Sequence, residues 1–229
     1  MMNRPVALVT GATRGIGRAI AIELSSTHRI LVGGRDAARA GELVAELDDA
    51  APFVCDLADE DAVAAACAGI GRLDVLVHSA GIGRSNDIGL ASRALWREVF
   101  ETNVFAVADL TRLLLPALEA ARGIVVAINS GAGFFSSPGG GVYAGSKFAL
   151  RALTDALREE MRGKVRVCSI HPGRTDTDMQ RELQAAMGNE HYNGSCYVSP
   201  GSVAAAVRLA VDTPDNATVE QLSIRPSVF

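Results

Sequence analysis

Short apolar runs alternate with amphipathic or alanine-rich stretches along this 229-residue chain. That alternation is typical of an α/β protein, in which helices cover both faces of a parallel sheet. The run 124–128 is apolar throughout, as is expected of a strand buried on both faces. The pattern therefore predicts a three-layer, doubly wound parallel sheet of about seven strands. The predicted strands are 5–10, 29–33, 52–55, 74–78, 123–129, 165–170 and 221–224.

Helical patterns fill the intervals, and no repeat, charge block or Pro/Ser-rich linker divides the chain. We therefore expect a single domain over residues 1–229. The stretch 173–199 lacks clear periodicity, and we expect a mobile loop with a short helix there, at the end of the sheet where ligands bind. The predicted helices are 15–26, 37–47, 60–68, 92–119 (which a break near Asn103 could interrupt), 143–162 and 200–211.

The composition narrows the classes of function. A formal net charge of −4 argues against nonspecific binding to nucleic acid or to an anionic membrane. The N-terminus lacks the apolar segment of a signal peptide, and no apolar run approaches the length of a membrane-spanning helix. The four cysteines are scattered, which favours free thiols over a disulfide framework or a structural metal. We therefore expect a cytoplasmic protein that binds neither a metal nor nucleic acid nor a membrane.

A glycine-rich turn follows the first predicted strand and opens the first predicted helix. Main-chain N–H groups at a helix N-terminus suit a pyrophosphate. We expect Gly11 to allow the tight turn, Gly15 the close approach of phosphates, and Gly17 close packing of the helix on the strand. The Gly-x-x-x-Gly-x-Gly spacing differs from the common dinucleotide fingerprint, so a purely structural turn is the alternative. The turn reads Thr10-Gly11-Ala12-Thr13-Arg14-Gly15-Ile16-Gly17.

The end of the second predicted strand bears on the choice of dinucleotide. NAD-binding folds place an acidic residue there to hold the ribose 2′-hydroxyl. Here Gly33 and Gly34 precede Arg35, which leaves room and positive charge for a 2′-phosphate. Arg14 in the glycine turn could reach the same phosphate. Asp36 is the counter-evidence, although its place before a helix fits an N-cap. We therefore expect NADP(H), with NAD(H) as the alternative.

Tyr143 and Lys147 are four residues apart on a predicted helix and so share one of its faces. An ammonium beside a phenol favours the phenolate and lowers the pKa of the tyrosine. A tyrosine tuned in this way can give or take a proton near neutral pH. The pair therefore predicts general acid–base chemistry.

Three further segments accompany the glycine turn and the Tyr143/Lys147 pair, and all occur in the order typical of one protein family. They are Asn103 within 102–104, Ser130 at a strand end, and residues 171–177. In this combination the chain resembles the short-chain dehydrogenases/reductases over essentially its whole length. The resemblance implies a Rossmann-like fold, NADP(H)-dependent interconversion of a carbonyl and a secondary alcohol, and a homodimer or homotetramer.

The same resemblance implies roles for the four polar side chains. Tyr143 would donate or accept the proton, and Lys147 would lower its pKa and bind the nicotinamide ribose. Ser130 would hold the substrate oxygen; a strand-end hydroxyl that caps a turn is the alternative. Asn103 would anchor a water in a proton relay; a capping asparagine is the alternative.

Cofactor contacts are implied outside the glycine turn as well. Asp56 would contact adenine and Thr175 the nicotinamide carboxamide, with a helix cap and a turn threonine as the alternatives. His78 and Ser79 stand where the family usually has two asparagines, and we interpret His78 as a hydrogen-bonded strand-end histidine. The implied cofactor-binding residues are Gly11, Thr13, Arg14, Gly15, Ile16, Gly17, Arg35, Asp56, Leu57, Ala80, Gly81, Tyr143, Lys147, Pro172, Gly173 and Thr175.

Two other classes of function compete with this prediction. A regulatory protein could sense NADP(H) on the same fold without turnover, but an intact Ser130, Tyr143 and Lys147 set fits a working enzyme better. A serine hydrolase needs Gly-x-Ser-x-Gly, and the leading glycine is missing before Ser130.

The substrate stays open beyond a small carbonyl or alcohol. The C-terminal stretch 218–226 is unlike that of the ketoacyl reductases and more like that of reductases acting on small hydroxy acids or assorted carbonyls. Arg174 or Arg181 could meet a substrate carboxylate, although each could equally be a surface arginine.

Overall fold

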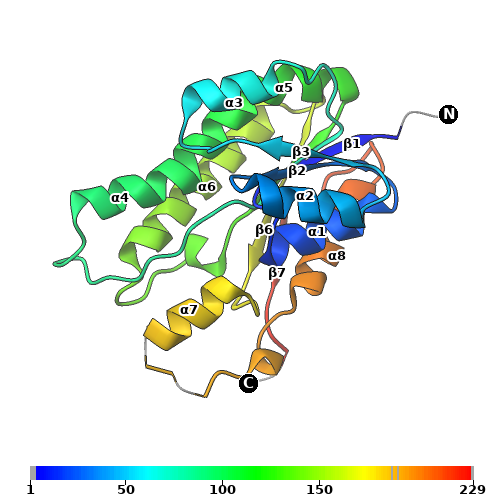
Figure 1. Cartoon of the computed structure of the whole chain (residues 1–229). Helices are drawn as coiled ribbons and strands as arrows, with labels where there is room; N and C mark the ends of the chain where they lie inside the picture. Colours follow the sequence, from blue (N-terminus) through cyan, green and yellow to red (C-terminus); the bar gives the residue numbers. More distant parts are fainter. Residues whose placement is uncertain (1–3, 187, 190, 228–229) are drawn as a thin grey trace.

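The computed structural model describes residues 4–186, 188–189 and 191–227. In this part of the chain seven parallel strands form one sheet in the order β3-β2-β1-β4-β5-β6-β7 (Figure 1). The Rossmann-like, doubly wound prediction is therefore confirmed. The strands are β1 Val6–Val9, β2 Arg29–Gly34, β3 Ala50–Val54, β4 Val75–His78, β5 Ile124–Ile128, β6 Arg166–Pro172 and β7 Gln221–Ile224.

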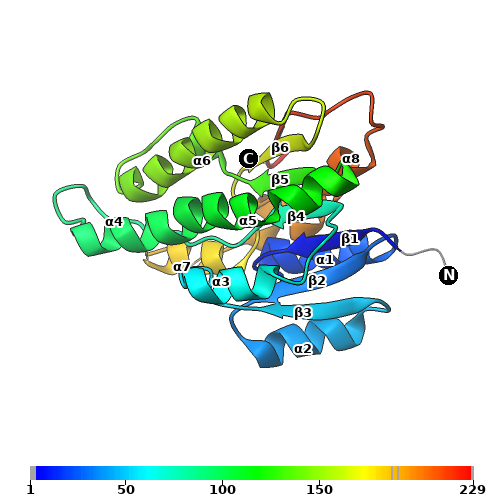
Figure 2. The same cartoon turned by 90° about the horizontal axis from the view of Figure 1, so that it is seen from above.

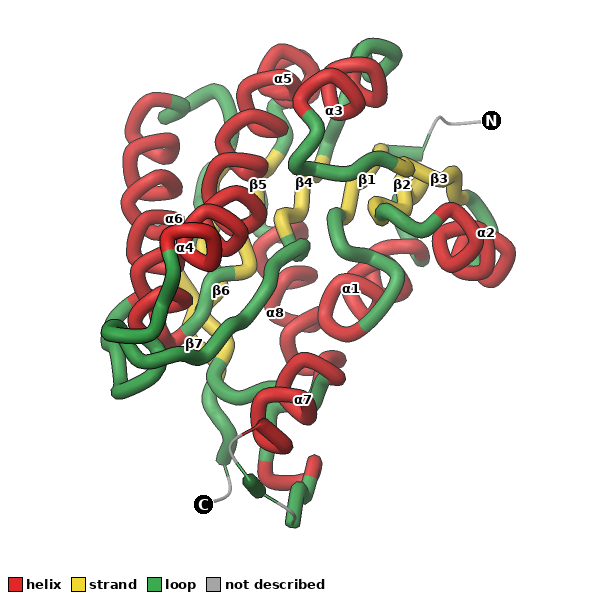
Figure 3. Tube along the Cα trace, turned by 60° about the vertical axis from the view of Figure 1, so that its left-hand side comes forward, coloured by secondary structure: helices red, strands yellow, loops and turns green. Residues whose placement is uncertain are grey.

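Helices cover both faces of the sheet. Figure 3 shows α3, α4, α5 and α6 on one face and α1, α2, α7 and α8 on the other, and the view from above in Figure 2 agrees. The helices are α1 Gly15–Ser25, α2 Ala37–Glu46, α3 Glu60–Cys67, α4 Arg93–Phe100, α5 Ala106–Ala121, α6 Gly141–Glu160, α7 Asp178–Ala186 and α8 Pro200–Asp212.

The two helical layers enclose two apolar cores, one on each face. Neighbouring residues of a strand point to opposite faces, so one strand contributes to both cores. In β1, Ala7 and Val9 pack with α1 and α8, while Leu8 packs with α3 and α5. The continuous apolar run in β5 is explained in the same way, because Val126 and Val125 enter different cores.

Polar side chains fix where several helices begin. Asp36 accepts hydrogen bonds from the N–H groups of Ala38 and Arg39, so the predicted N-cap of α2 is confirmed. Asp59 caps α3 in the same manner. These caps place the turns after β2 and β3 at the carboxyl edge of the sheet.

The expected break near Asn103 is a π-helical turn, η1 (Glu101–Phe105), which joins α4 to α5. One extra residue in the turn keeps the chain helical while it rotates the side chains that follow, and such turns are frequent at functional sites.

The stretch 173–199 is more ordered than its sequence suggests. It contains α7 and the 3-10 turn η3 (Gly194–Cys196), and a parallel bridge joins Thr175 to Val198. None of the helices in the described part of the chain is long and apolar enough to cross a membrane.

Candidate active site

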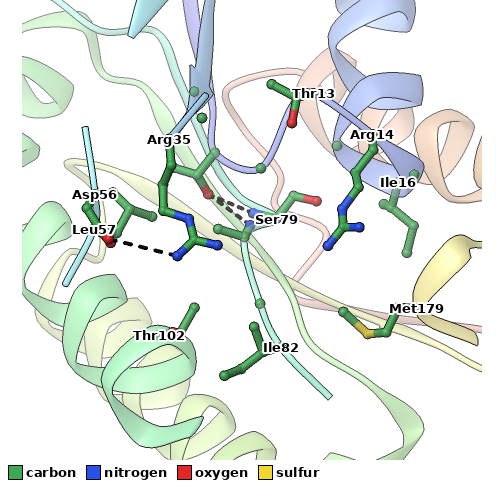
Figure 4. A pocket seen from close by; sticks show the side chains of 18 of the residues that line it. Thr13, Arg14, Ile16, Arg35, Asp56, Leu57, Ser79, Ile82, Thr102 and Met179 are labelled. Carbon is green, nitrogen blue, oxygen red and sulfur yellow. Dashed lines mark hydrogen bonds and ion pairs between the residues drawn. The ribbon is translucent and has the colours of Figure 1, made fainter. Parts of the chain in front are cut away.

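The strand order reverses between β1 and β4, and ligands of doubly wound folds bind where such a reversal occurs. A cavity of about 260 Å³ opens at this point, along the carboxyl ends of β1, β2, β3 and β4 (Figure 4). Its walls contain many of the residues predicted to bind the cofactor: Gly11, Thr13, Arg14, Gly15, Ile16, Gly17, Arg35, Asp56, Leu57, Ala80 and Gly81.

Two glycines of the turn are required by its backbone conformation. Gly11 and Gly15 have φ values of +63° and +55°, which L side chains rarely adopt. A Cβ on Gly11 would also lie only 2.9 Å from Cα of Ala80. Thr10 joins these two segments further, because its hydroxyl accepts hydrogen bonds from the N–H groups of Ser79 and Ala80 at 3.0 and 3.1 Å.

Gly17 is required by packing. A Cβ there would lie 2.2 Å from the carbonyl oxygen of Gly11. The expected close packing therefore brings the first turn of α1 against the glycine turn itself. The first residues of α1, Gly15, Ile16 and Gly17, therefore line the cavity.

Two guanidinium groups turn into the cavity, from Arg14 at the start of α1 and from Arg35 after β2 (Figure 4). Arg35 forms a long ion pair with Asp56 at 3.8 Å, and its side chain is 76% exposed. Arg14 has no ion pair within the described residues. Exposed pairs of this kind contribute little to stability, so Arg35 is available to another anion.

Gly33 and Gly34 both line the cavity beside Arg35, and close packing also requires them. A Cβ on Gly33 would lie 2.6 Å from the carbonyl oxygen of Val9, and one on Gly34 would lie 2.8 Å from Cγ2 of Thr13. The room that these glycines leave is therefore partly filled by the neighbouring strand and the glycine turn, which come close to β2.

Ser130, Tyr143 and Lys147 meet beside the end of β5. Ser130 caps the 3-10 turn η2 (Gly131–Gly133), where its Oγ accepts a hydrogen bond from Ala132 N at 3.1 Å. Tyr143 and Lys147 lie one turn apart near the start of α6, with Nζ 5.8 Å from the centre of the phenol ring. The ammonium is buried and donates to the carbonyl of Ile128 at 3.0 Å.

The pKa values at this site are set mainly by burial. Burial raises the pKa of Tyr143, and a hydrogen bond with the Ser130 side chain acts in the opposite direction. Burial lowers the pKa of Lys147 to about 8. Burial dominates the pKa of Tyr143 and the Lys147 ammonium is directed to Ile128, so the lowering of that pKa by Lys147 stays a prediction.

Asn103 connects the cavity to the part of α6 that carries Tyr143. Its Oδ1 accepts from Ile82 N at 2.9 Å, and its Nδ2 donates to Ile82 O and to Oγ of Ser146, both at 3.0 Å. Ser146 in turn donates to the carbonyl of Tyr143 at 2.7 Å. Asn103 therefore ties a cavity-lining residue to the first turn of α6.

The residues that follow β6 are only partly in the predicted place. Thr175 donates to the carbonyl of Gly173 at 3.1 Å, as a turn threonine does, and is 6% exposed. The cavity wall is formed further along by Thr177, Asp178 and Met179. The sequence analysis did not single these residues out, although a threonine followed by an aspartate at a helix start was a usable signal. Ser79, Ile82 and Thr102 also line the cavity.

Two buried histidines lie behind the site. His78 shares a 2.8 Å hydrogen bond with Oγ of Thr111, so the prediction of a hydrogen-bonded strand-end histidine is confirmed. His171 lies 3.1 Å from the carbonyl oxygen of Ser130 through Nδ1, and its ring packs against Phe134. Burial lowers the pKa of both rings.

Comparison with known proteins gives the class of protein that this fold and site define. The family model of the short chain dehydrogenases matches residues 5–188. The chain belongs to the short-chain dehydrogenase/reductase family of oxidoreductases.

Three similar proteins illustrate the relationship. Serine 3-dehydrogenase of Agrobacterium fabrum is 33% identical over 233 residues, which cover 96% of this chain and 92% of that protein. The alcohol dehydrogenase of Thermococcus sibiricus, complexed with 5-hydroxy-NADP, superimposes with a TM-score of 0.89 at 27% identity and covers 98% of this chain and 97% of its own. The closed form of serine dehydrogenase complexed with NADP+ gives a TM-score of 0.88 at 27% identity, with 96% and 94% covered.

Proposed function

We propose that this protein is an NADP(H)-dependent oxidoreductase that interconverts a small carbonyl compound and its secondary alcohol, with Tyr143 as the general acid and base. The observation that carries the proposal is the meeting of Ser130, Tyr143 and the buried Lys147 beside a cavity that two arginines enter. The cytoplasmic location and the homodimer or homotetramer stay predictions.

The cavity fits an NADP-type dinucleotide on three counts. The glycine turn presents main-chain N–H groups at the start of α1, where a pyrophosphate is stabilised by the helix dipole. Arg14 and Arg35 can bind a 2′-phosphate, and two structural relatives were solved with NADP or an NADP analogue. Asp56, already beside Arg35, can accept a hydrogen bond from adenine.

The bound cofactor would supply the hydride chemistry. The chain would supply the proton and the placement of the substrate. Burial keeps the phenol of Tyr143 protonated at neutral pH, so it can protonate a carbonyl oxygen during reduction. The hydroxyl of Ser130 can donate a hydrogen bond to the same oxygen as negative charge develops on it. Lys147 would bind the nicotinamide ribose, and Asn103 would hold a water in the proton relay.

The test combines cofactor binding with turnover. A ligand that binds only the native state stabilises it by about 2.7 kcal/mol at a hundredfold excess over Kd. NADPH should therefore raise the Tm of the wild type more than NADH does, because Arg14 and Arg35 would bind its 2′-phosphate. Carbonyl compounds and alcohols, L-serine among them because of the serine 3-dehydrogenase relative, are then screened by absorbance of NADPH.

Tyr143→Phe is the decisive variant. It should abolish turnover and keep the NADPH-dependent Tm shift, since the phenol transfers the proton while the cavity binds the dinucleotide. Turnover retained by this variant would contradict the acid–base role. A wild type that binds NADPH and turns over no compound would favour the regulatory alternative.

A further inference from the structure

The residue that follows β7 brings an unpaired cation to the proposed catalytic serine. Strand β7 runs beside β6 (Figure 3) and parallel to it, with Ile224 paired to Pro172. Arg225 therefore emerges at the carboxyl edge of the sheet, next to Gly173. The N–H group of Gly173 donates to the carbonyl of Ile224 at 2.7 Å, which fixes this end of the chain.

Two glycines make room for the Arg225 side chain. A Cβ on Gly173 would lie 3.4 Å from Cδ of Arg225, and a Cβ on Gly131 would lie 2.5 Å from its Nη1. The stem therefore passes over Gly173, and the guanidinium lies over the residue next to Ser130. Phe135 lies beside it, with its ring centre 5.7 Å from Cζ.

Charge balance distinguishes Arg225 from most arginines of the chain. Arg158, for example, pairs with Asp155 at 2.8 Å, and Arg208 lies within ion-pair distance of Glu23 and Asp212. Within the described residues the guanidinium of Arg225 has no ion pair and no hydrogen bond. Arg225 is exposed, so its guanidinium can present its fork of N–H donors to a ligand.

The arginines considered from the sequence are less suited to this role. Arg181 is paired with Asp176 at 2.9 Å and with Asp178 at 3.6 Å. Arg174 is exposed, and it is Arg225 whose guanidinium lies against Gly131, next to Ser130. Arg225 is thus the arginine that the structure brings next to the site of proton transfer.

We propose that Arg225 binds the carboxylate of a small hydroxy acid, or of the matching keto acid, whose hydroxyl or carbonyl oxygen lies on Ser130 and Tyr143. A carboxylate is the anion that one guanidinium fork binds in a bidentate manner, and its single negative charge matches this single unpaired cation. Phe135 supplies an apolar wall for the carbon atoms between the two ends. The inference rests on the proposed function, whose substrate class it narrows.

Acids and their methyl esters provide the test, since an ester keeps the reacting group and removes the charge. The pairs are L-serine, 3-hydroxybutyrate, lactate and acetoacetate, each with its methyl ester. The wild type should turn over at least one acid more efficiently than its ester. Arg225→Gln should lower kcat/KM for that acid by about 10- to 100-fold and change that of the ester less than about threefold, because one charge-assisted hydrogen-bonded pair is lost.

Two further variants separate recognition from architecture. Arg225→Lys keeps the charge without the fork and should recover part of the loss. Arg174→Gln is the matched control and should leave the acid-to-ester ratio unchanged. Equal losses for acid and ester in Arg225→Gln would show that Arg225 merely supports the Gly131 turn and would overturn the inference.

A second readout does not need turnover. With NADP+ at saturation, the same pairs are scored by the additional rise in Tm that each compound produces. A wild type that shows no preference for any acid by either readout overturns the inference on Arg225. The proposed function fails separately, by the absence of an NADPH-dependent Tm shift or by turnover retained in Tyr143→Phe.

Discussion

The ammonium of Lys147 donates a 3.0 Å hydrogen bond to the main-chain carbonyl of Ile128, the last residue of β5. The lysine is 4% exposed, and within the described residues no carboxylate forms an ion pair with it. A buried ammonium that is held by a neutral carbonyl is destabilising relative to the same group in water. The burial of the Lys147 ammonium therefore costs stability.

The first prediction concerns that cost. Burial lowers the pKa of Lys147 to about 8 from the 10.5 of an exposed lysine, which corresponds to a loss of about 3 kcal/mol in folding stability at pH values below 8. Between pH 8 and 10.5 the unfolded chain binds more protons at this group than the folded chain, so the stability of the folded state rises with pH over that window.

Lys147→Met should therefore raise the free energy of unfolding at pH 7 by about 1–3 kcal/mol while it removes turnover. The gain should shrink from pH 8 towards pH 10.5, and urea unfolding at several pH values measures it. The exposed Lys164→Met is the control, with an expected change within about 0.5 kcal/mol. A Lys147→Met variant that is less stable than the wild type at pH 7 would show that the bond to Ile128 outweighs the burial of charge.

The second prediction concerns the choice of dinucleotide. Arg35 is 76% exposed and only loosely paired with Asp56, so its removal should hardly affect folding. Arg35→Ala should raise the Kd for NADPH by about 10- to 100-fold, because it loses a charge-assisted contact to the 2′-phosphate, and should leave the Kd for NADH within about twofold.

Arg39→Ala is the matched control for this experiment. Arg39 is also exposed and lies one helical turn further along, where it pairs with Asp36 outside the cavity. Fluorescence titration of the three proteins with both dinucleotides gives the answer. Equal losses for NADPH and NADH in Arg35→Ala would remove the argument for a 2′-phosphate site.

The sequence was sufficient for the sheet, for most of the cavity and for the caps, because each depends on a local pattern. The glycine turn, for example, needs only Gly11, Gly15 and a strand before them. Strand ends differ from prediction by one or two residues at several places, because pairing with the neighbouring strand decides where each strand ends.

Other features depend on contacts between distant segments and could not be read from a local pattern. The π-helical turn contains Asn103, whose side chain accepts a hydrogen bond from the N–H group of Ile82, 21 residues earlier. Gly33 is explained by the approach of Val9, and the direction of the Lys147 ammonium by the carbonyl of Ile128. The upward shift that burial gives the pKa of Tyr143 could not be read from the sequence for the same reason, since the degree of burial is a property of the whole fold.

The third prediction uses two glycines that both lie inside helices. A Cβ on Gly17 in α1 would lie 2.2 Å from the carbonyl oxygen of Gly11, whereas a Cβ on Gly41 in α2 would have no atom within 4 Å. Gly17→Ala should therefore destabilise the protein by about 2–4 kcal/mol, because backbone must move in a packed region.

Gly41→Ala should instead stabilise the protein by about 0.5–1 kcal/mol, because alanine loses less conformational entropy in a helix. Thermal and urea unfolding of the two variants measure the difference in sign. The NADPH-dependent Tm shift should be weakened in Gly17→Ala and unchanged in Gly41→Ala. Two variants of equal stability would mean that the turn and α1 can separate without cost.

The last prediction concerns acid stability and His78. The ring is 3% exposed, and burial lowers its pKa to about 4 from the 6.5 of an exposed histidine. Between pH 6.5 and 4 the unfolded chain therefore binds more protons at this group, so the stability that the neutral ring provides is lost as the pH falls through that window, by about 3 kcal/mol in total.

The hydroxyl of Thr111 donates to the carbonyl of Val107 at 2.7 Å, which leaves its oxygen to accept the Nε2 proton of neutral His78. His78→Asn keeps a donor for Thr111 and cannot be protonated, so its free energy of unfolding should fall less steeply from pH 6.5 to pH 4 than that of the wild type. His191→Asn, at an exposed position, should follow the wild-type curve, and the shared contributions of His28 and His171 cancel in the comparison. If the curves of His78→Asn and the wild type have the same slope, the acid sensitivity comes from other groups.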